Sequence, residues 1–511
     1  MMHDREKSDP SIVAAKSPNK TAPAAAEAME PREGAEGNAF EPSTLRTPSR
    51  GSVTAGLERV RRTARLKKKE RFTALLHHVS VDLLRFAYSR LKRDAAAGVD
   101  GMTWDEYGVD LDRRLADLHA RVHCGSYRTQ PSQRRYIPKP DGRQRPLGIA
   151  ALEDKIVQRA LCEVLNAIYE EDFLGFSYGF RPERSQHDAL DALAVGIESR
   201  AVNWILDADI AGFFDAVSHE WLLRFVEHRI GDRRVIRLIR KWLKAGVLEN
   251  GQVTPTEAGT PQGAVISPLL ANITLHYVFD LWAEQWRRQY ASGDMIVVRY
   301  ADDIVVGLQH QADADRFKAE MAQRLAAFAL TLHPDKTRLI EFGRHAETNR
   351  NGRGLGKPET FDFLGFTHIC ARSRAGRFQL RRRSRRDRMR AKLREIRDAL
   401  WQHRHAPLDE QGSWLGQVVR GYFAYHAVPN NSTALSEFRG IVLWHWLRAL
   451  RRRGQRDKNT WASINRLADR WLPKPKVLHP WPSQRFAVKH PRWEPYALIG
   501  LVRLCAGGAQ Q

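Results

Sequence analysis

The stretch Met295–Leu308 constrains the fold more than any other part of this sequence. Two short apolar runs, 295–298 and 304–308, flank the polar tip Tyr300-Ala-Asp-Asp303. Each run is rich in β-branched residues and too short for an ordinary helix, so the pattern predicts a β-hairpin with two carboxylates at its turn. Adjacent carboxylates repel each other, and a divalent cation that takes oxygen ligands relieves the repulsion. The alternative is an exposed polar turn between two strands.

A second group of acids lies about ninety residues earlier. Residues 204–209 read as a buried strand that runs into a turn, with Asp207, Asp209 and Asp215 on or near it. Buried acids are costly unless they are paired or bound to metal. If this strand lies beside the hairpin, the acids of both could hold two metal ions. Two ions roughly 3.5–4 Å apart clamp the attacking and leaving oxygens of a phosphoryl transfer.

The overall charge indicates the kind of partner. The 511 residues carry a formal net charge of +24 and a pI of about 10.2, which favours nucleic acid first and an anionic membrane surface second. No apolar run approaches the roughly 20 residues of a membrane-spanning helix, and the N-terminus has no apolar signal core. The four cysteines are far apart, so the sequence suggests neither a zinc site nor a disulfide framework.

The motifs resemble those of reverse transcriptases encoded by group II introns. Tyr300–Asp303 is similar to the reverse transcriptase signature. Residues 209–215 (Asp-Ile-Ala-Gly-Phe-Phe-Asp) and 259–270 (Gly-Thr-Pro-Gln-Gly-Ala-Val-Ile-Ser-Pro-Leu-Leu) resemble motifs of the group II intron branch, in the same order. The resemblance covers roughly Leu75 to Leu504. It implies an α+β fold, a right-hand polymerase of fingers, palm and thumb, followed by a mostly helical maturase (X) domain.

Composition and the resemblance together give the expected domains. The first segment mixes Pro, Ala, Ser, Glu and Gly without periodicity, which is typical of disorder. The dense arginines of 381–403, with apolar residues at helical spacing, predict a thumb helix, and 416–429 resembles the maturase domain. No cysteine pair follows, so no HNH endonuclease is expected. The expected parts are a disordered leader (1–55), fingers and palm (56–370), thumb (371–405), a linker (406–412), the maturase domain (413–495) and a C-terminal tail (496–511).

For catalysis, the resemblance implies that Asp209, Asp302 and Asp303 hold two Mg²⁺ ions. The backbone carbonyl of Ile210 would add to the metal shell. Asp209 is preferred over Asp207 because the family's ligand directly precedes Ile in this motif. Asp207 is then expected to face the other side of the strand or to make local hydrogen bonds.

Four residues are candidates for binding the incoming nucleotide. Lys139 and Arg145 flank the turn signal Pro140-Asp-Gly142 in a fingers hairpin, and they would face the triphosphate or else grip template phosphates. Phe214 would exclude a ribose 2′-OH, or it is a core phenylalanine. Gln262 would lie near the nucleotide or the primer-template, and the alternative is a bare glycine-rich turn.

Further candidates contact the nucleic acid strands. Lys336 could reach a phosphate near the active site, and the segment Phe363-Leu364-Gly365 resembles the primer grip, with an ordinary core strand as competitor. Arg386 and Arg390 would lie along the template-primer duplex, unless they form a merely solvated face. Arginines that follow a tryptophan-containing helix are candidates for RNA binding, namely Arg448, Arg451, Arg452 and Arg453.

The function implied by the resemblance is RNA-directed DNA synthesis by a group II intron-encoded protein that also binds intron RNA to assist splicing and mobility. The alternatives are a splicing-only maturase and a related bacterial reverse transcriptase of the retron or defence type. The expected partners are group II intron RNA, an RNA template with a DNA primer, deoxynucleoside triphosphates and target DNA. A homodimer is possible, no membrane is expected, and the expected location is the bacterial cytoplasm, near the nucleoid.

Overall fold

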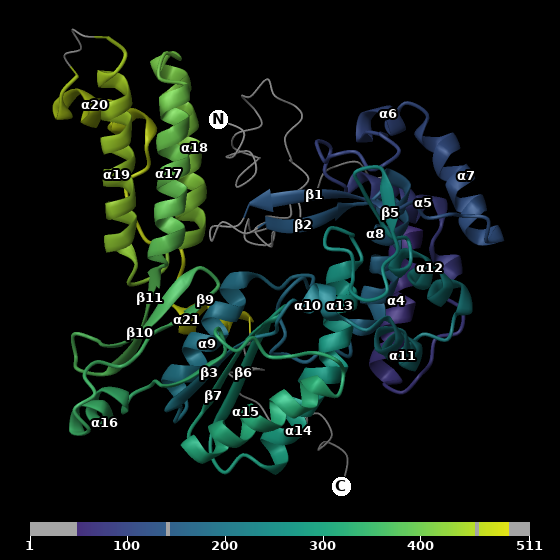
Figure 1. The fold of residues 1–511 in the computed structure, drawn as a ribbon, viewed down its shortest axis with the longest axis horizontal. Helices are drawn as coiled ribbons and strands as arrows, with labels where there is room; N and C mark the ends of the chain where they lie inside the picture. Colours follow the sequence, from purple (N-terminus) through teal and green to yellow (C-terminus); the bar gives the residue numbers. More distant parts are fainter. Residues whose placement is uncertain (1–48, 139–143, 455–458, 490–511) are drawn as a thin grey trace.

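The computed structural model describes residues 49–138, 144–454 and 459–489, which form an α+β fold of three small sheets surrounded by helices (Figure 1). The buried side chains form two cores. The larger core is built mostly from residues between Val60 and Leu380, and the smaller one lies among helices between Met389 and Leu472. No helix within the described ranges is long and apolar enough to cross a bilayer.

The central sheet contains the predicted hairpin. Its antiparallel strands have the order β6-β7-β3-β8. All six residues of β6 are buried, which explains why its sequence is an apolar run rather than an alternating one. The hairpin pairs β6 with β7 from Met295↔Leu308 to Tyr300↔Asp303, so that prediction is confirmed. The strands are β3 (Trp204–Asp209), β6 (Met295–Tyr300), β7 (Asp303–Leu308) and β8 (Arg338–Glu341).

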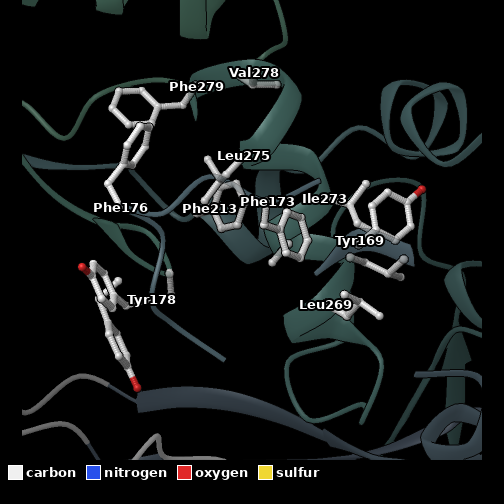
Figure 2. Packing of buried hydrophobic residues seen from close by; sticks show 14 of the residues in the cluster. Tyr169, Phe173, Phe176, Tyr178, Phe213, Leu269, Ile273, Leu275, Val278 and Phe279 are labelled. Atoms are coloured by element: carbon white, nitrogen blue, oxygen red, sulfur yellow. The ribbon is translucent and has the colours of Figure 1, made fainter. Parts of the chain in front are cut away.

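Helices pack against this sheet and form the larger core around it. α9 lies against β6, and α15 lies against β3 and β7. Figure 2 shows apolar side chains from the end of α8 (Leu152–Tyr169), from α13 and from the short helix that contains Phe213 packing together in this core. The elements are α9 (Gln186–Ser199), α10 (Phe213–Ala216), α13 (Ser267–Leu275), the π-helical turn η3 (His276–Asp280), α14 (Leu281–Gln289), α15 (Gln311–Ala326) and α16 (Ala346–Gly352).

The second sheet has the order β2-β1-β4-β5 and is flanked by the N-terminal helices. β1 (Ser132–Pro138) and β2 (Gln144–Ile149) pair antiparallel, as the turn signal between them predicts, while the turn itself lies outside the described residues. The short strands are β4 (Val247–Glu249) and β5 (Gln252–Thr254). The flanking helices are α4 (Ser49–Leu66), η2 (Leu76–His78), α5 (Val81–Ser89), α6 (Trp104–Gly108), α7 (Leu111–Cys124), α8 (Leu152–Tyr169), α11 (His219–Arg229) and α12 (Arg233–Leu243).

The third sheet, β11-β10-β9, corrects one prediction. The arginine-rich run expected to be helical from 381 to 403 begins as a strand, because β11 (Phe378–Ser384) pairs along its whole length with β10 (Phe366–Arg372). In β11, residues 380, 382 and 384 are buried and those between them are not, which is the period of a strand. An arginine in a buried strand position, Arg382, interrupts the apolar alternation that would have indicated a strand. The helix α17 (Arg386–Gln402) follows, and β9 (Phe361–Phe363) completes the sheet.

The C-terminal helices form the smaller core, and their ends differ from the expected boundaries. α17 packs against α19, so the expected thumb helix and maturase helices share one core. α18 begins at Leu408, within the expected linker 406–412. α4 begins at Ser49, within the expected leader 1–55, because its apolar side contributes Val60 and Ala64 to the core. The helices are α18 (Leu408–His426), α19 (Ser432–Arg451), α20 (Trp461–Trp471) and α21 (Pro482–Lys489).

After α20 the chain leaves the smaller core, and α21 packs against the larger one. It packs on α9, where Phe486 is buried and Arg485 Nε lies 3.3 Å from Asp191 Oδ2. The same carboxylate accepts a hydrogen bond from Arg382 of β11 at 2.8 Å. The C-terminal segment is therefore tied to the central part of the molecule through one buried acid.

Candidate active site

The three candidate acids meet at one end of the central sheet. Asp209, the last residue of β3, is directly opposite Asp303, the first residue of β7. Because Tyr300 pairs with Asp303, the hairpin turn consists of Ala301 and Asp302, and Ala301 adopts a φ of 56°. A non-glycine residue in this region is uncommon and costs energy, so the surrounding structure must hold the turn.

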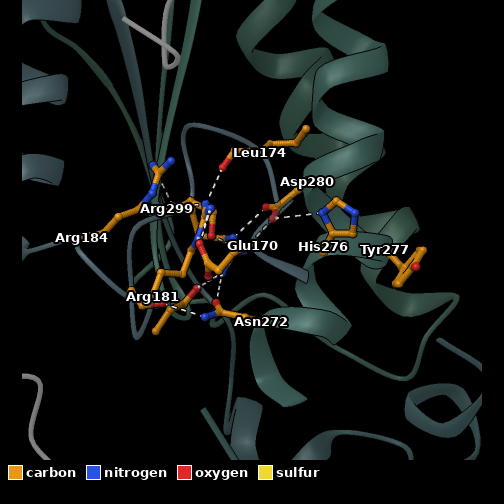
Figure 3. Close-up of polar contacts among 12 residues, drawn as sticks. Glu170, Leu174, Arg181, Arg184, Asn272, His276, Tyr277, Asp280 and Arg299 are labelled. Atoms are coloured by element: carbon orange, nitrogen blue, oxygen red, sulfur yellow. Dashed lines mark hydrogen bonds and ion pairs between the residues drawn. The ribbon is translucent and has the colours of Figure 1, made fainter. Parts of the chain in front are cut away.

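A buried arginine beneath the turn supplies that support (Figure 3). Arg299 and Asp280 are completely buried and form a two-bonded ion pair, with Nη2–Oδ2 at 2.6 Å and Nε–Oδ1 at 2.7 Å. Arg299 also donates to the carbonyl of Ala301 at 3.0 Å, to Asn272 Oδ1 at 3.0 Å and to Ser177 Oγ at 2.7 Å. One side chain thereby joins β6, the π-helical turn, α13 and the 177–182 loop to the backbone just before Asp302.

The 177–182 loop presses directly on the turn from the other side. A Cβ at Gly179 would lie 2.3 Å from the backbone nitrogen of Ala301, so only glycine fits there. Asn272 Nδ2 donates to the carbonyl of Gly179 at 2.7 Å. Arg181 is buried and bonded to Glu170 and to the carbonyls of Leu174 and Ser177, which assigns it a structural role in this loop rather than a phosphate contact.

Burial first, and like charge second, raise the pKa values of the acids in the hairpin turn. Burial away from water and the carboxylate of Asp209 raise the pKa of Asp302, while the cations Arg145 and Lys336 lower it. Asp303 is open to solvent on one side, yet the protein around it and the neighbouring carboxylates raise its pKa as well. Lys336 Nζ lies 2.6 Å from Asp209 Oδ2 and partly compensates this charge. Uncompensated negative charge is the condition that a dication relieves.

Asp207 does not face the other side of the strand, which was one of the two expectations for it. It lies on the same, more open face of β3 as Asp209, because residues two apart in a strand share a face. Its carboxylate is 3.5 Å from Arg338 Nη2 on the neighbouring β8. Burial raises its pKa to about 6, against the opposing effect of Arg338. Asp207 thus extends the negative surface of the site away from the turn.

The carboxylates of Asp209, Asp302 and Asp303 are suitable ligands for a hard divalent cation, although their side-chain conformations do not bring them around one point. Within the described ranges, no group of three or more His, Cys, Asp or Glu side chains forms a ready metal site, and Asp209 is turned to Lys336. Directly opposed residues of antiparallel strands have Cβ atoms about 4.5–5.5 Å apart, so rotation of the Asp209 side chain brings it to Asp303. Carboxylate oxygens are the ligands that Mg²⁺ takes.

The carbonyl of Ile210 remains usable by such an ion. Ile210 forms an isolated antiparallel bridge with Leu332. The two hydrogen bonds beside this bridge run from Ala211 N to Thr331 O and from His333 N to Asp209 O, so neither uses the Ile210 carbonyl.

The two neighbouring phenylalanines differ in burial. Phe213 is buried in the larger core, whereas Phe214 is only half-buried, and their rings meet edge to face at 5.5 Å. The backbone of Phe214 is fixed by Thr260, whose N–H donates to its carbonyl at 2.7 Å. A Cβ at Gly259 would lie 2.8 Å from that carbonyl, which explains the glycine.

Gln262 joins the same region to the second sheet. Its carbonyl accepts a hydrogen bond from Gly148 N at 2.5 Å, at the end of β2. Its side-chain Oε1 is buried and has no hydrogen-bond partner among the residues that the structure describes. A buried amide oxygen without a partner is unfavourable, so this atom is available to a ligand.

The cationic candidates fall into three groups. Arg145 is exposed on β2 and its charge lowers the pKa of Asp302, while Lys139 lies outside the described residues. Arg386 and Arg390 are exposed on α17, from which the charge of Arg388 acts on Asp303. The four distal arginines lie at the far end of α19, and they are Arg448, Arg451, Arg452 and Arg453.

These distal arginines differ in what they contact. Arg448 lies over the ring of Trp444 at 4.7 Å, and Arg452 lies over the ring of Trp401 at 5.5 Å. Both tryptophans are about half exposed. Arg453 instead donates to the carbonyl of Ala406 at 2.7 Å and helps to hold the α17–α18 connection.

The segment Phe363-Leu364-Gly365 forms the tight turn between β9 and β10. Phe363 pairs with Phe366, and both turn residues have positive φ, 46° at Leu364 and 78° at Gly365. Tyr425 of α18 donates its hydroxyl hydrogen to the carbonyl of Leu364 at 2.7 Å. A helix of the smaller core therefore fixes a strained turn of the third sheet.

Sequence reasoning missed three contributors to the site, namely Arg299, Asp280 and Tyr425. A lone arginine inside an otherwise apolar strand was a usable signal for Arg299, because a buried cation requires an acid. Its partner Asp280 and the hydroxyl of Tyr425 carry no local signal, since each acts on a residue distant in the sequence.

Comparisons with known proteins agree with this geometry. Residues 137–368, which include all three acids, match the family model described as reverse transcriptase (RNA-dependent DNA polymerase). Protein YkfC of Escherichia coli (strain K12) is 34% identical in an alignment of 316 residues, which covers 55% of this chain and 78% of YkfC.

Relatives named for introns are also found. Group II intron-encoded protein LtrA of Lactococcus lactis subsp. cremoris is 37% identical over 222 residues, which are 43% of this chain and 37% of LtrA. The nuclear intron maturase 2, mitochondrial, of Arabidopsis thaliana is 24% identical in an alignment of 233 residues, which covers 38% of this chain and 30% of that protein. The chain thus spans most of YkfC but little more than a third of LtrA.

Proposed function

Because the chain belongs to the reverse transcriptase family, in the branch of group II intron-encoded reverse transcriptases and maturases, it is an RNA-directed DNA polymerase, and we propose how its residues carry out the reaction. The central sheet is the palm, the β1–β2 hairpin belongs to the fingers, and α17 begins the thumb. The remaining helices, α18 to α21, form the maturase domain.

Asp209, Asp302 and Asp303 hold two Mg²⁺ ions in this proposal. The opposition of Asp209 and Asp303 across β3 and β7, with Asp302 in the adjoining turn, is the observation that carries it. When bound, the ions lower the pKa of the primer 3′-hydroxyl and neutralise the charge of the triphosphate. Arg299 and Asp280 keep the turn in place, which holds the backbone of Asp302 and Asp303 in position before the ions bind.

The reaction joins the 3′-oxygen of a DNA primer to the α-phosphorus of a deoxynucleoside triphosphate. The bond between the α-phosphorus and the bridging oxygen breaks, pyrophosphate leaves and the hydroxyl proton passes to solvent. Arg145 binds the triphosphate from the fingers, and Phe214 packs under the sugar, where a 2′-OH would clash. Gln262 offers its unpartnered oxygen to the nucleotide or the primer-template. Positioning and charge neutralisation supply most of the rate.

The nucleic acid strands are held from the third sheet and the helices. The 363–365 turn supports the primer end by its backbone, and the exposed arginines Arg386 and Arg390 follow the template-primer duplex. Arg448, Arg451 and Arg452, with Trp401 and Trp444, bind intron RNA by charge and stacking. Through these contacts the chain assists splicing and, with target DNA, mobility.

The test is primer extension by the purified chain on an RNA template with a DNA primer and the four deoxynucleoside triphosphates. The proposal predicts a DNA product that requires Mg²⁺ and stops when the metal is chelated. A chain that binds intron RNA and promotes its splicing but extends no primer would instead be a splicing-only maturase. The placement of three acids at one end of the central sheet supports the polymerase over a splicing-only maturase, because RNA binding alone has no need of clustered carboxylates.

A further inference from the structure

A segment that follows α20 closes the end of α18. Residues 477–489, here called the C-terminal strap, include α21. The backbone N–H groups of Leu478 and His479 donate to the carbonyl of Ala427 at 2.9 and 3.2 Å, and His479 Nε2 donates to the carbonyl of Ala424 at 2.7 Å. The last carbonyls of a helix have no partner inside it, so the C-terminal strap supplies donors that this end of α18 lacks.

The last turn of α18 also contains Tyr425, whose ring belongs to a group of three aromatic rings. The ring of His187, from α9, lies 5.0 Å from that of Tyr425 and 4.0 Å from that of His479, centroid to centroid. His187 is 3% exposed, and neither of its ring nitrogens has a hydrogen-bond partner among the described residues. Burial lowers the pKa of His187 to about 2, so its ring is neutral and these ring contacts locate it. The position of the Tyr425 ring therefore depends on His187, and that of His187 on the C-terminal strap.

The ring of His479 is oriented by a buried acid. Arg485 Nη2 donates to His479 Nδ1 at 2.8 Å, and because Nε2 is already a donor, His479 is neutral with its hydrogen on Nε2. Arg485 Nε lies 3.3 Å from Oδ2 of Asp191, and Oδ1 of the same acid accepts from Arg382 at 2.8 Å. Asp191 belongs to α9, beside which α21 lies in Figure 1. This acid thus sets Arg485, and through it the ring of His479.

Stability alone does not explain these polar groups. Apolar residues of similar volume often replace a buried ion pair without loss of stability, and buried nitrogens without partners, such as those of His187, are unfavourable. The contacts instead fix one relative geometry of α9, α18 and the C-terminal strap. That geometry ends at Tyr425, whose hydroxyl donates to the carbonyl of Leu364 at 2.7 Å. Leu364 and Gly365 both have positive φ, so their turn requires support from outside.

We propose that His479 and Arg485 are positioning residues for the primer end. They fix the ring of Tyr425, and Tyr425 fixes the 363–365 turn that supports the primer. The end of the maturase domain thereby contributes to DNA synthesis, and not only to RNA binding. The use of the turn by the primer rests on the proposed function, whereas the coupling between the C-terminal strap and the turn rests on the contacts alone.

The test uses two variants of the C-terminal strap, H479A and R485M. H479A removes the ring that touches His187 and the side-chain bond to α18. R485M keeps the aliphatic length of the side chain but removes the charge that faces Asp191 and the hydrogen bond to His479. Should H479A fail to fold, R485M carries the test by itself, because it leaves Asp191 paired with Arg382.

Two variants outside this cluster are the matched controls. V488A changes a residue of the C-terminal strap that is 81% exposed, and R372M removes an exposed arginine of β10 that pairs with Glu347. Both controls should match the unsubstituted chain in the two measurements that follow.

The first measurement is backbone hydrogen exchange in residues 361–368, which reports on the turn without any catalysis. Exchange there should be faster in both variants of the C-terminal strap, because the turn opens more often when its support is weakened. The second measurement is steady-state primer extension, which separates KM for primer from kcat. KM for primer should rise roughly five-fold or more, as expected for Tyr425→Phe, with kcat within about twofold.

The variant H479A/Y425F tests whether the effect passes through Tyr425. Its KM for primer should stay within about twofold of that of Y425F alone, because both changes interrupt one connection. Multiplied effects in this double variant would overturn the inference. A lower melting temperature with unchanged exchange and KM would also overturn it, since the cluster would then serve stability alone.

The outcomes distinguish this inference from the proposed function. A raised KM in Y425F with unchanged KM in H479A and R485M would overturn the inference and leave the primer contact of the turn intact. Faster exchange with unchanged KM in all three would contradict that primer contact, and with it the inference. A chain that extends no primer but shows the predicted exchange would support the coupling and contradict only the polymerase mechanism.

Discussion

Lys336 and Asp209 form an ion pair at the end of the central sheet, with 2.6 Å between Nζ and Oδ2. The lysine is about half exposed and belongs to the segment after α15. In the same segment, His333 N donates a hydrogen bond to the carbonyl of Asp209. The same cation lowers the pKa of Asp302. One side chain therefore competes with any dication for the candidate ligands while it stabilises their ionised forms.

Lys336→Met should consequently reduce the Mg²⁺ concentration needed for half-maximal primer extension by several-fold, because the ion no longer competes with the ammonium group for Asp209. A Mg²⁺ titration of initial rates measures the change, and Lys336→Arg, which keeps the charge, is the control. A higher Mg²⁺ requirement in the methionine variant would show that Lys336 assists metal binding instead.

The position of the candidate acids was predictable because the evidence for it is local. An apolar run, a short acidic tip and a second apolar run already specify a hairpin, and an acid at the end of another buried strand suggests a partner for it. The sequence does not give the register that sets Asp209 opposite Asp303, since it depends on the pairing of β3 with β7 across ninety residues.

Other parts were not predictable, for identifiable reasons. The start of the arginine-rich run was expected to be helical because the buried Arg382 interrupts the apolar alternation of a strand, and its acid partner Asp191 is far away in the sequence. For Asp207, one of the two expectations was that it faces the other side of the strand, although strand geometry alone places Asp207 and Asp209 on one face. The role of Tyr425 depends on how α18 packs on the third sheet.

Phe214→Ala should raise the incorporation of ribonucleotides relative to deoxyribonucleotides by at least about tenfold, which corresponds to about 1.4 kcal/mol. The half-buried ring is expected under the sugar, whereas its neighbour Phe213 belongs to the core. Single-nucleotide extension with each triphosphate measures the ratio. Phe213→Leu is the matched control and should lower thermal stability without changing sugar discrimination. Unchanged discrimination in Phe214→Ala would exclude the gate.

Tyr425→Phe should weaken primer use and leave RNA binding intact. The substitution removes only the hydroxyl that donates to the Leu364 carbonyl, in a turn with two residues at positive φ. Losing one hydrogen bond to a half-buried carbonyl costs about 1–3 kcal/mol, so the KM for primer should rise by roughly five-fold or more. Tyr290→Phe, at an exposed tyrosine after α14, is the control. A fall in kcat with unchanged primer KM would argue against support of the primer end.

Asp280→Asn should destabilise the chain by about 3–5 kcal/mol, because it leaves the completely buried guanidinium of Arg299 without its anion. Thermal melting measures the loss, and primer extension well below the melting temperature should fall further, since Arg299 also holds the carbonyl of Ala301. The double variant Arg299→Met/Asp280→Leu should be more stable than Asp280→Asn and remain poorly active. Full activity in the double variant would remove the positioning role of Arg299.

In the proposed mechanism, Asp209, Asp302 and Asp303 share metal ions that drive DNA synthesis. This is tested by primer extension on an RNA template by Asp302→Asn/Asp303→Asn, with binding of the same RNA measured in parallel. The synthesis of cDNA should fall by several orders of magnitude, with RNA affinity within about threefold of the unsubstituted chain, because the RNA is held elsewhere by exposed arginines. Full cDNA yield from this double variant would contradict it.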